Sequence, residues 1–277
     1  MIEYDLSNIK CTKTIQISSA TNCCSSWGNN VHNILNVVVL GIITHRCPII
    51  NLSNSYFNLS VNAYNLPKKQ PVSTHNVDIY MNMSILSSVM GDEANHMLIR
   101  GRLCEPQSLF ANVMHENQLH LYSTLYKQLI PYSKETIPFS FGIHIRSGRW
   151  FKDMKNHTTI KKFSEDVIQK CIIPYKKLFC NNCIPLLATD NKYVRTYIEK
   201  SIPETMFVDH EEISPRRDDW GSFSVASNVL RDVELMSKAS NGMIVSARST
   251  LSLIMAYAQN KNSAHMPITL YPDGSCV

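Results

Sequence analysis

The sequence predicts an α/β protein of two doubly wound domains, each a largely parallel sheet with helices on both faces. Along most of the chain, apolar stretches of strand length alternate with helical segments of about 10 to 15 residues, which is typical of this class. The length of 277 residues suits two domains of about 130 residues each. Apolar residues make up 44% of the chain, enough for a sizeable core in each domain.

The first half begins with a strand, a helix and a second strand. Residues 14–17 are typical of a short strand, and a polar loop separates them from a helical segment over 29–46 and a strand over 47–52. That order is the repeating unit of a parallel sheet. Residues 52–82 are polar and give no assignment. A further helix is predicted by apolar side chains at helical spacing: Leu119, Tyr122, Leu125, Tyr126 and Leu129.

A domain boundary is expected within residues 130–140, where two prolines and a charged patch interrupt the pattern. The predicted domains are therefore 1–135 and 136–277. In the second domain, the expected strands cover residues 139–146, 184–188, 205–208, 242–246 and 267–271. The helices between them have these apolar faces: Phe163, Val167, Ile168, Cys171 and Ile172; Val194, Tyr197 and Ile198; Leu230, Val233 and Met236; and the last helix over 250–259.

Charge and hydropathy exclude several classes of protein. The net charge of +5 is too small for a nucleic-acid-binding protein, but it suits a small anionic ligand. The most apolar run, 34–43, is broken by Asn36 and is too short to span a membrane, so a buried helix is expected there. The first residues lack the layout of a signal peptide. The chain as printed is therefore expected to be cytoplasmic, with the lumen of the ER or Golgi as the alternative if an anchoring segment is missing.

The nine cysteines have irregular spacing and do not form a recognisable disulfide framework. Cys180 and Cys183 have the spacing of a zinc-binding pair, but no second pair completes a tetrahedral site. We therefore expect ordinary reduced or packed thiols and no metal site.

The stretch FGIHIRSGRW, residues 141–150, places two polar side chains on an apolar strand. Period-two alternation puts His144 and Arg146 on the same face, and Ser147-Gly148 is typical of the turn that ends the strand. Parallel α/β sheets bind ligands beyond the carboxyl ends of their strands, and an arginine fork suits a phosphate. The alternative is that Arg146 pairs with a carboxylate while His144 is a core histidine.

Four more residues complete a candidate anion site. Ser249 and Thr250 fall where a strand passes into the last helix, so the helix amides and dipole can hold a phosphate; Arg248 is a secondary candidate beside them. Together with Arg146, this helix start would form a diphosphate clamp. Asp190 ends the strand before the next helix, where it either faces the ligand or caps that helix.

Five motifs in this order resemble GDP-fucose-dependent fucosyltransferases, most closely the α1,6- and O-fucosyltransferase superfamily. They are SSWGNNVHNILNVVVLGIITHRCPIINL, GIHIRSG, LLATDN, LRDVELMSKA and MIVSARSTLSLIMAYA. The resemblance implies a GT-B fold, in which two Rossmann-like domains face a cleft, and an inverting mechanism without a bound metal or other cofactor.

Carried over to this sequence, the resemblance implies a role for each C-terminal motif. His144 and Arg146 match the pair that meets the diphosphate of the nucleotide sugar. Asp232 matches the acid that recognises guanine, although a carboxylate in the first turn of a helix is also favoured by the helix dipole. Ser249 and Thr250 match the hydroxyl-bearing turn that holds the phosphates.

In the N-terminal motif, Gly28 and Asn29 match the turn that faces the cleft. The chain departs from the family at Arg149, where relatives often carry an acid. Asp153 is the nearest carboxylate downstream and is the candidate general base.

The sequence thus predicts a glycosyltransferase that moves L-fucose from GDP-fucose to a glycan or glycoprotein. One alternative is a transferase of the same fold that takes another nucleotide sugar. The other is a catalytically silent relative that binds a glycan or a partner protein, which the basic residue Arg149 at the acid position favours. A nucleic-acid partner is not expected.

Overall fold

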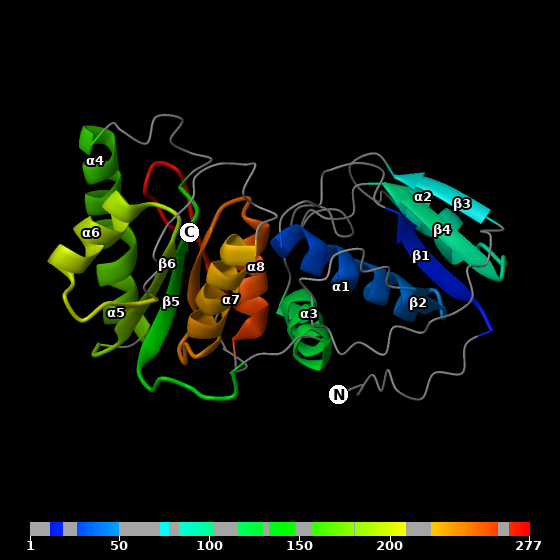
Figure 1. Ribbon diagram of the computed structural model, residues 1–277, viewed down its shortest axis with the longest axis horizontal. Helices are drawn as coiled ribbons and strands as arrows, with labels where there is room; N and C mark the ends of the chain where they lie inside the picture. The colour runs from blue at the N-terminus through cyan, green and yellow to red at the C-terminus, as the bar shows by residue number, and fades with distance from the viewer. Residues whose placement is uncertain are drawn as a thin grey trace. The chain divides into compact units, whose positions relative to one another are not determined.

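The computed structural model describes residues 12–18, 27–49, 73–77, 83–101, 116–129, 133–147, 157–179, 181–208, 223–259 and 266–277. The chain divides into two compact units, Met1–Met114 and His115–Val277 (Figure 1). The division falls before helix α3 (Glu116–Leu129), whereas the sequence predicts it after this segment. Packing explains the difference, because Tyr122 of α3 stacks on Tyr257 of the second unit with ring centroids 5.3 Å apart.

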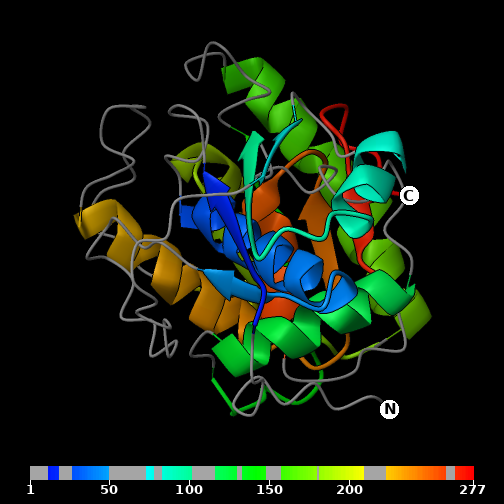
Figure 2. The same cartoon turned by 90° about the vertical axis from the view of Figure 1, so that its right-hand side faces the viewer.

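The N-terminal unit contains a four-stranded parallel sheet in the order β2-β1-β4-β3. Its elements, coloured from blue to cyan-green in Figure 2, are β1 (Thr14–Ser18), α1 (Trp27–Ile43), β2 (Cys47–Ile49), β3 (Ser73–Val77), α2 (Met83–Met90) and β4 (His96–Gly101). The predicted strand–helix–strand unit is confirmed in β1, α1 and β2. In contrast, β3, α2 and β4 have no counterpart among the predicted elements.

Helix α1 is the buried helix that the apolar run predicts. Asn36 and His32 lie on it almost without exposure and hydrogen-bond to one another, with Nδ2 and Nδ1 3.1 Å apart. The helix ends at a left-handed His45, after which Arg46 N donates to Gly41 O. Gly41 permits this close return, because a Cβ there would lie 2.7 Å from the Arg46 carbonyl oxygen.

The C-terminal unit contains a five-stranded parallel sheet in the order β7-β6-β5-β8-β9. Its strands are β5 (Ser140–Ile145), β6 (Ile184–Thr189), β7 (Met206–Phe207), β8 (Met243–Ser246) and β9 (Ile268–Leu270). Counted within the unit, the order is 3-2-1-4-5, which is that of a doubly wound sheet. The order reverses between β5 and β8, so the ligand-binding edge is expected at the carboxyl ends of these two strands.

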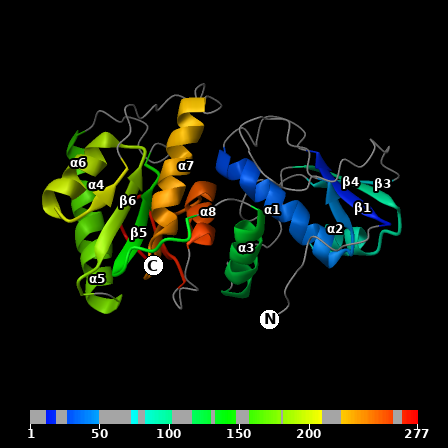
Figure 3. The same ribbon diagram turned by 60° about the horizontal axis from the view of Figure 1, so that its bottom comes forward.

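Helices cover both faces of this sheet, with α4, α5 and α6 on one face and α7 and α8 on the other (Figure 3). The helical segments are α4 (His157–Val167), a π-helical turn (Ile168–Ile172), α5 (Ile173–Phe179), α6 (Lys192–Ser201), α7 (Phe223–Ser237) and α8 (Thr250–Ala258). The two parallel α/β units confirm the predicted fold class. None of the helices among the described residues is long and apolar enough to cross a membrane.

The core of the C-terminal unit forms around β5, which is buried along its whole length. Phe141, Ile143 and Ile145 pack against helices α4 and α6, as the period-two pattern predicts. Gly142 faces the other layer, where a Cβ would lie 3.1 Å from the Met236 sulfur. One predicted core residue is wrong, since Leu230 on α7 is 43% exposed.

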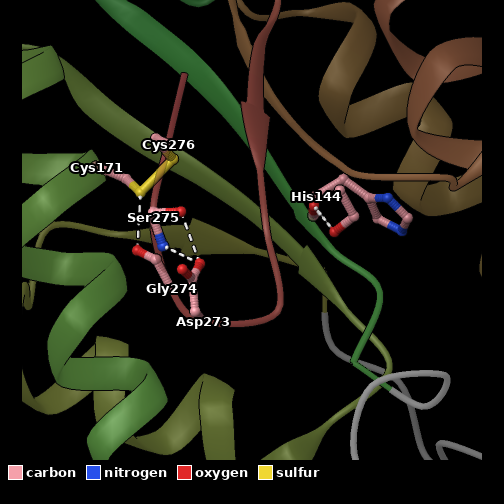
Figure 4. The surroundings of a disulfide bond; sticks show 7 residues. His144, Cys171, Asp273, Gly274, Ser275 and Cys276 are labelled. Carbon is pink, nitrogen blue, oxygen red and sulfur yellow. Dashed lines mark hydrogen bonds between the residues drawn. A yellow bond between two sulfur atoms is a disulfide. The ribbon is translucent and has the colours of Figure 1, made fainter.

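The expected reduced thiols are also a wrong prediction. Cys171 and Cys276 form a disulfide (Figure 4), and Cys47 and Cys183 are disulfide-bonded as well. Cysteine spacing along the sequence does not show which thiols the fold brings together, because the first pair is separated by 105 residues.

Candidate functional site

Arg146 and Asp190 lie side by side at the carboxyl ends of two strands of the C-terminal sheet. Arg146 follows β5 and Asp190 follows β6, the strand paired with it. The Arg146 Nη1 donates to Asp190 Oδ2 at 2.7 Å, and the other carboxylate oxygen accepts from Ser147 N at 2.9 Å and Ser147 Oγ at 3.1 Å. Both carboxylate oxygens therefore hold the Arg146-Ser147 segment. The carboxylate partner that the sequence left open for Arg146 is Asp190.

This pairing also shows that Asp190 is not a helix cap. The N-cap of α6 is Asn191, whose Oδ1 accepts from Tyr193 N at 3.0 Å and from Val194 N at 3.3 Å. The alternative in which Asp190 caps α6 is wrong, because the cap is the next residue. The aspartate is instead available to orient the guanidinium.

A second set of hydrogen bonds joins β5 to β8 at the point where the strand order reverses. Ser246, the last residue of β8, accepts from Arg146 N at 2.8 Å and donates to the His144 carbonyl oxygen at 2.8 Å. One hydroxyl thus spans the ends of both strands. This role could not be predicted from the sequence, because a serine at the end of a strand has many structural uses.

His144 is buried between β5 and α8, with 3% of its surface exposed. Its Nδ1 is hydrogen-bonded to Ser252 Oγ of α8, and that same oxygen accepts from Ser246 N at 3.1 Å. Burial, reinforced by the charge of Arg146, lowers the pKa of His144 from 6.5 to about 3. The ring is therefore neutral at ordinary pH. Figure 4 shows it on the side of the sheet away from the Cys171–Cys276 disulfide.

The geometry of His144 is that of the core histidine which the sequence left open as an alternative. Its hydrogen bond fixes the amino end of α8 relative to β5. His144 and Ser252 thus join β5 to the first turn of α8.

The loop from β8 to α8 brings three predicted residues together. Ser249 is the N-cap of α8, and its hydroxyl accepts from Ser252 N at 3.3 Å. Thr250 is the first helical residue and is half-buried. Arg248, exposed just before them, has a left-handed φ of 58°, which is uncommon for a residue other than glycine. The helix start predicted from the sequence is confirmed.

Asp232 lies in the middle of α7, half-buried, nine residues after the helix begins at Phe223. The prediction that it opens a helix is wrong, and with it the alternative that the dipole of a first turn explains it. The helix that carries it packs on α8.

The remaining predicted residues fall in the other unit or outside the described residues. Gly28 and Asn29 belong to the first turn of α1, and not to a turn before the helix as predicted. Asp153 and Arg149 lie outside the described residues. Across the described ranges, no three histidine, cysteine or acidic side chains gather in an arrangement suited to a metal ion.

Comparisons with known proteins find similarity among solved structures, at low sequence identity. No protein-family model matches the sequence, and no curated protein is similar to it. The chain is similar to the fucosyltransferase NodZ from Bradyrhizobium in selenomethionine form, with a TM-score of 0.43, 13% identity, and coverage of 87% of this chain and 90% of that chain.

It is also similar to a NodZ α-1,6-fucosyltransferase co-crystallised with GDP. Here the TM-score is 0.45 and the identity 14%, with coverage of 91% of this chain and 97% of that chain. The fold and the site define an α/β protein of two parallel-sheet units, with a basic edge at the reversal of strand order in the second.

Proposed function

We propose that the chain is a glycosyltransferase of GT-B type that transfers fucose from GDP-fucose to a glycan or glycoprotein. The main support is the hydrogen bond from Arg146 N to Ser246 Oγ, which is 2.8 Å long. It joins the carboxyl ends of β5 and β8, so Arg146 and the loop into α8 flank the position where doubly wound sheets bind nucleotides. The order of the five sequence motifs supports fucose and guanine as the particular sugar and base.

The chemistry of this edge suits a diphosphate. The Arg146 side chain is 26% exposed, so its guanidinium reaches solvent, and Arg248 is exposed beside the amino end of α8. Two cations and a helix dipole favour an anion that bridges them. Asp190 contributes one negative charge and, on this proposal, acts by orienting Arg146 without contacting the donor.

In the proposed reaction, an acceptor hydroxyl attacks the anomeric carbon of fucose from the face opposite the leaving group. A new C–O bond forms, the bond from that carbon to the β-phosphate oxygen breaks, and GDP leaves with the electron pair. A base takes the proton of the acceptor, and Asp153 is the proposed base. Because negative charge grows on GDP in the transition state, preorganised donors at Arg146 and α8 accelerate the reaction.

Asp232 is proposed as the residue that recognises guanine. A carboxylate can accept two hydrogen bonds from the N1 and N2 groups of guanine, which uracil does not offer in that arrangement. Asp232→Asn should therefore bind GDP and UDP with similar affinity, while the wild-type chain prefers GDP. A retained preference for GDP in the variant would contradict this role.

The proposed function is tested by nucleotide binding followed by turnover. Thermal unfolding of the full chain with GDP, UDP, ADP and CMP should show the largest rise in Tm with GDP. Release of GDP from GDP-fucose should then be measured with an array of glycan and peptide acceptors. A rise with UDP or ADP alone would favour another nucleotide sugar, and GDP binding without any GDP-fucose turnover would favour a silent binding protein.

A matched pair of variants makes the test specific to the site. Arg248→Ala should reduce the effect of GDP on Tm, because it removes an exposed cation beside α8. Lys200→Ala removes an exposed cation at the end of α6 and should leave the effect unchanged. Equal behaviour of the two variants would argue against the proposed position of the diphosphate.

A further inference from the structure

The bonding state of the cysteines indicates the kind of compartment in which this protein folds. The described part of the chain contains four cysteines, and all four are disulfide-bonded: Cys47, Cys171, Cys183 and Cys276. Three of them are nearly inaccessible, with 2% of Cys47, 3% of Cys171 and none of Cys183 exposed. Both units of the chain contain at least one bonded cysteine. Buried thiols in a reducing compartment are ordinarily unpaired, so this pattern is typical of proteins that fold under oxidising conditions.

The fold brings Cys171 and Cys276 within bonding range. Cys171 lies in the π-helical turn between α4 and α5, and Cys276 is the penultimate residue of the sequence. Their Cα atoms are 5.6 Å apart, inside the range that disulfides require. The bond therefore closes a long loop between two segments that the fold has already placed side by side.

The C-terminal segment is shaped to fit this position. After β9 the chain turns at Gly274, whose amide donates to Tyr271 O at 3.0 Å, and Thr269 and Val277 then exchange two backbone hydrogen bonds. Gly274 has a φ of 79°, and a Cβ there would lie 2.6 Å from the Asp166 Cβ on α4. Only glycine satisfies both conditions, so the turn is matched to the helix against which the disulfide holds it.

The same segment supports one side of the candidate site. Leu270 of β9 pairs with Cys276 in an antiparallel bridge, and its carbonyl oxygen accepts from Ala247 N at 2.8 Å. Ala247 precedes Arg248 in the loop from β8 to α8. A short path of backbone contacts thus leads from the disulfide through β9 to that loop.

We propose that this protein folds in an oxidising compartment, and that the Cys171–Cys276 disulfide is a structural bond that holds β9 and the loop before α8 in place. The proposal replaces the cytoplasmic location expected from the sequence. In the step that forms the bond, the two thiols lose two electrons and two protons. The oxidant is a disulfide of a thiol oxidoreductase or a small molecule, which is reduced to two thiols by exchange.

The first test identifies the redox state of the cysteines in cells that make the full chain. Unpaired thiols are blocked with N-ethylmaleimide in intact cells, and the protein is digested without a reductant and analysed by mass spectrometry. The expected result is a peptide containing Cys171 linked to the peptide containing Cys276, with no maleimide on either cysteine. Maleimide on both cysteines in most molecules would overturn the proposal.

The second test measures what the bond does. The disulfide closes a loop of 105 residues. Its loss in the double variant Cys171→Ala/Cys276→Ala should therefore lower the Tm by on the order of 10 °C. Backbone amides at Ala247 and in β9 should exchange faster with solvent. Val277→Ala, which alters an 84% exposed side chain beside Cys276, should leave both properties unchanged.

An unaltered Tm and unaltered amide exchange in the double variant would overturn the structural role of the bond. A double variant that no longer folds would support that role, and the peptide linkage in the wild-type chain then decides the compartment. Neither readout depends on GDP-fucose turnover. A failure of the proposed function and a failure of this proposal are therefore distinguishable.

Discussion

The Asp190 carboxylate binds the Arg146 guanidinium at 2.7 Å across the ends of two adjacent parallel strands. The same carboxylate also accepts two hydrogen bonds from Ser147, so it fixes both the side chain and the backbone that follows β5. A carboxylate beside a phosphate-binding arginine opposes the anion by charge but orients the cation by geometry. The two effects are separable by mutation.

Arg146→Ala is predicted to slow transfer about 100-fold, a loss of roughly 3 kcal/mol typical of a charged contact to a developing anion, and to weaken GDP binding. Calorimetric titration of the folded variant with GDP provides the measurement. Because the ion pair is partly exposed, we expect less than about 1 kcal/mol of change in the free energy of unfolding. Unchanged GDP affinity would exclude Arg146 from the site.

Asp190→Asn is predicted to weaken GDP binding about 10-fold, because the neutral amide holds the guanidinium less firmly. In a chain that already carries Arg146→Ala, the same change should not weaken GDP binding and should raise the affinity slightly, because no guanidinium remains to be oriented and the charge that opposes the anion is gone. A double-mutant cycle by calorimetric titration tests this. Additive losses would show that Asp190 contacts the ligand independently.

Acid should destabilise the C-terminal unit through His144. Its pKa in the folded chain is lowered to about 3, against an ordinary value of 6.5. Between these values the unfolded chain binds more protons, so stability is full above about pH 6.5 and falls as the pH decreases. When the pH falls from 7 to 5, His144 should lower the free energy of unfolding by about 2 kcal/mol.

Urea unfolding at several pH values measures this dependence. His144→Gln removes the titrating group and should flatten the profile in that window. Burial also lowers the pKa of His32 to about 3. His32 therefore adds a similar pH dependence of stability in the other unit, and His144→Gln leaves that dependence unchanged. An identical profile for the variant and the wild-type chain would contradict the buried neutral state of His144.

Ser252→Ala should destabilise the C-terminal unit by about 2 kcal/mol, because it leaves His144 Nδ1 and Ser246 N without their buried partner. Ser201→Ala, at an exposed position in α6, should change stability by less than about 0.5 kcal/mol. Thermal unfolding of both variants gives the comparison. An unchanged Tm for Ser252→Ala would mean that the hydrogen bonds of the Ser252 hydroxyl contribute little to stability.

Gly274→Ala should lower the free energy of unfolding by at least about 1 kcal/mol, because its φ is positive and a Cβ would lie within 2.6 Å of Asp166. Gly91→Ala is the matched control, since a Cβ there meets its nearest neighbour at 3.4 Å without a positive φ. Equal Tm values for the two variants would contradict the fit of the C-terminal turn against α4.

The strands of the C-terminal unit could be predicted because each is a short apolar run bounded by polar or turn residues. β5, β6 and β8 are buried along most of their length, so their sequences are mainly apolar. In the N-terminal unit the same reasoning missed β3, an edge strand of mostly polar residues. It also missed β4, because its apolar run of Met97 to Ile99 is too short to identify an element.

Some of the candidate residues could be predicted from the sequence, but the hydrogen bonds between them could not. The pattern of β5 placed His144 and Arg146 on one face, and the β8–α8 junction placed Ser249 and Thr250 at the start of the last helix. Which partner each side chain takes depends on neighbouring strands that lie far away in sequence. The positions of Asp190, 44 residues from Arg146, and Ser252, 108 residues from His144, therefore appear only in the folded chain.

A structure of the full chain bound to GDP would show where the diphosphate binds. We expect it within hydrogen-bonding distance of the Arg146 guanidinium and of the amides that open α8 at Ser249 and Thr250. A diphosphate bound elsewhere, with Arg146 contacting no part of the nucleotide, would contradict it.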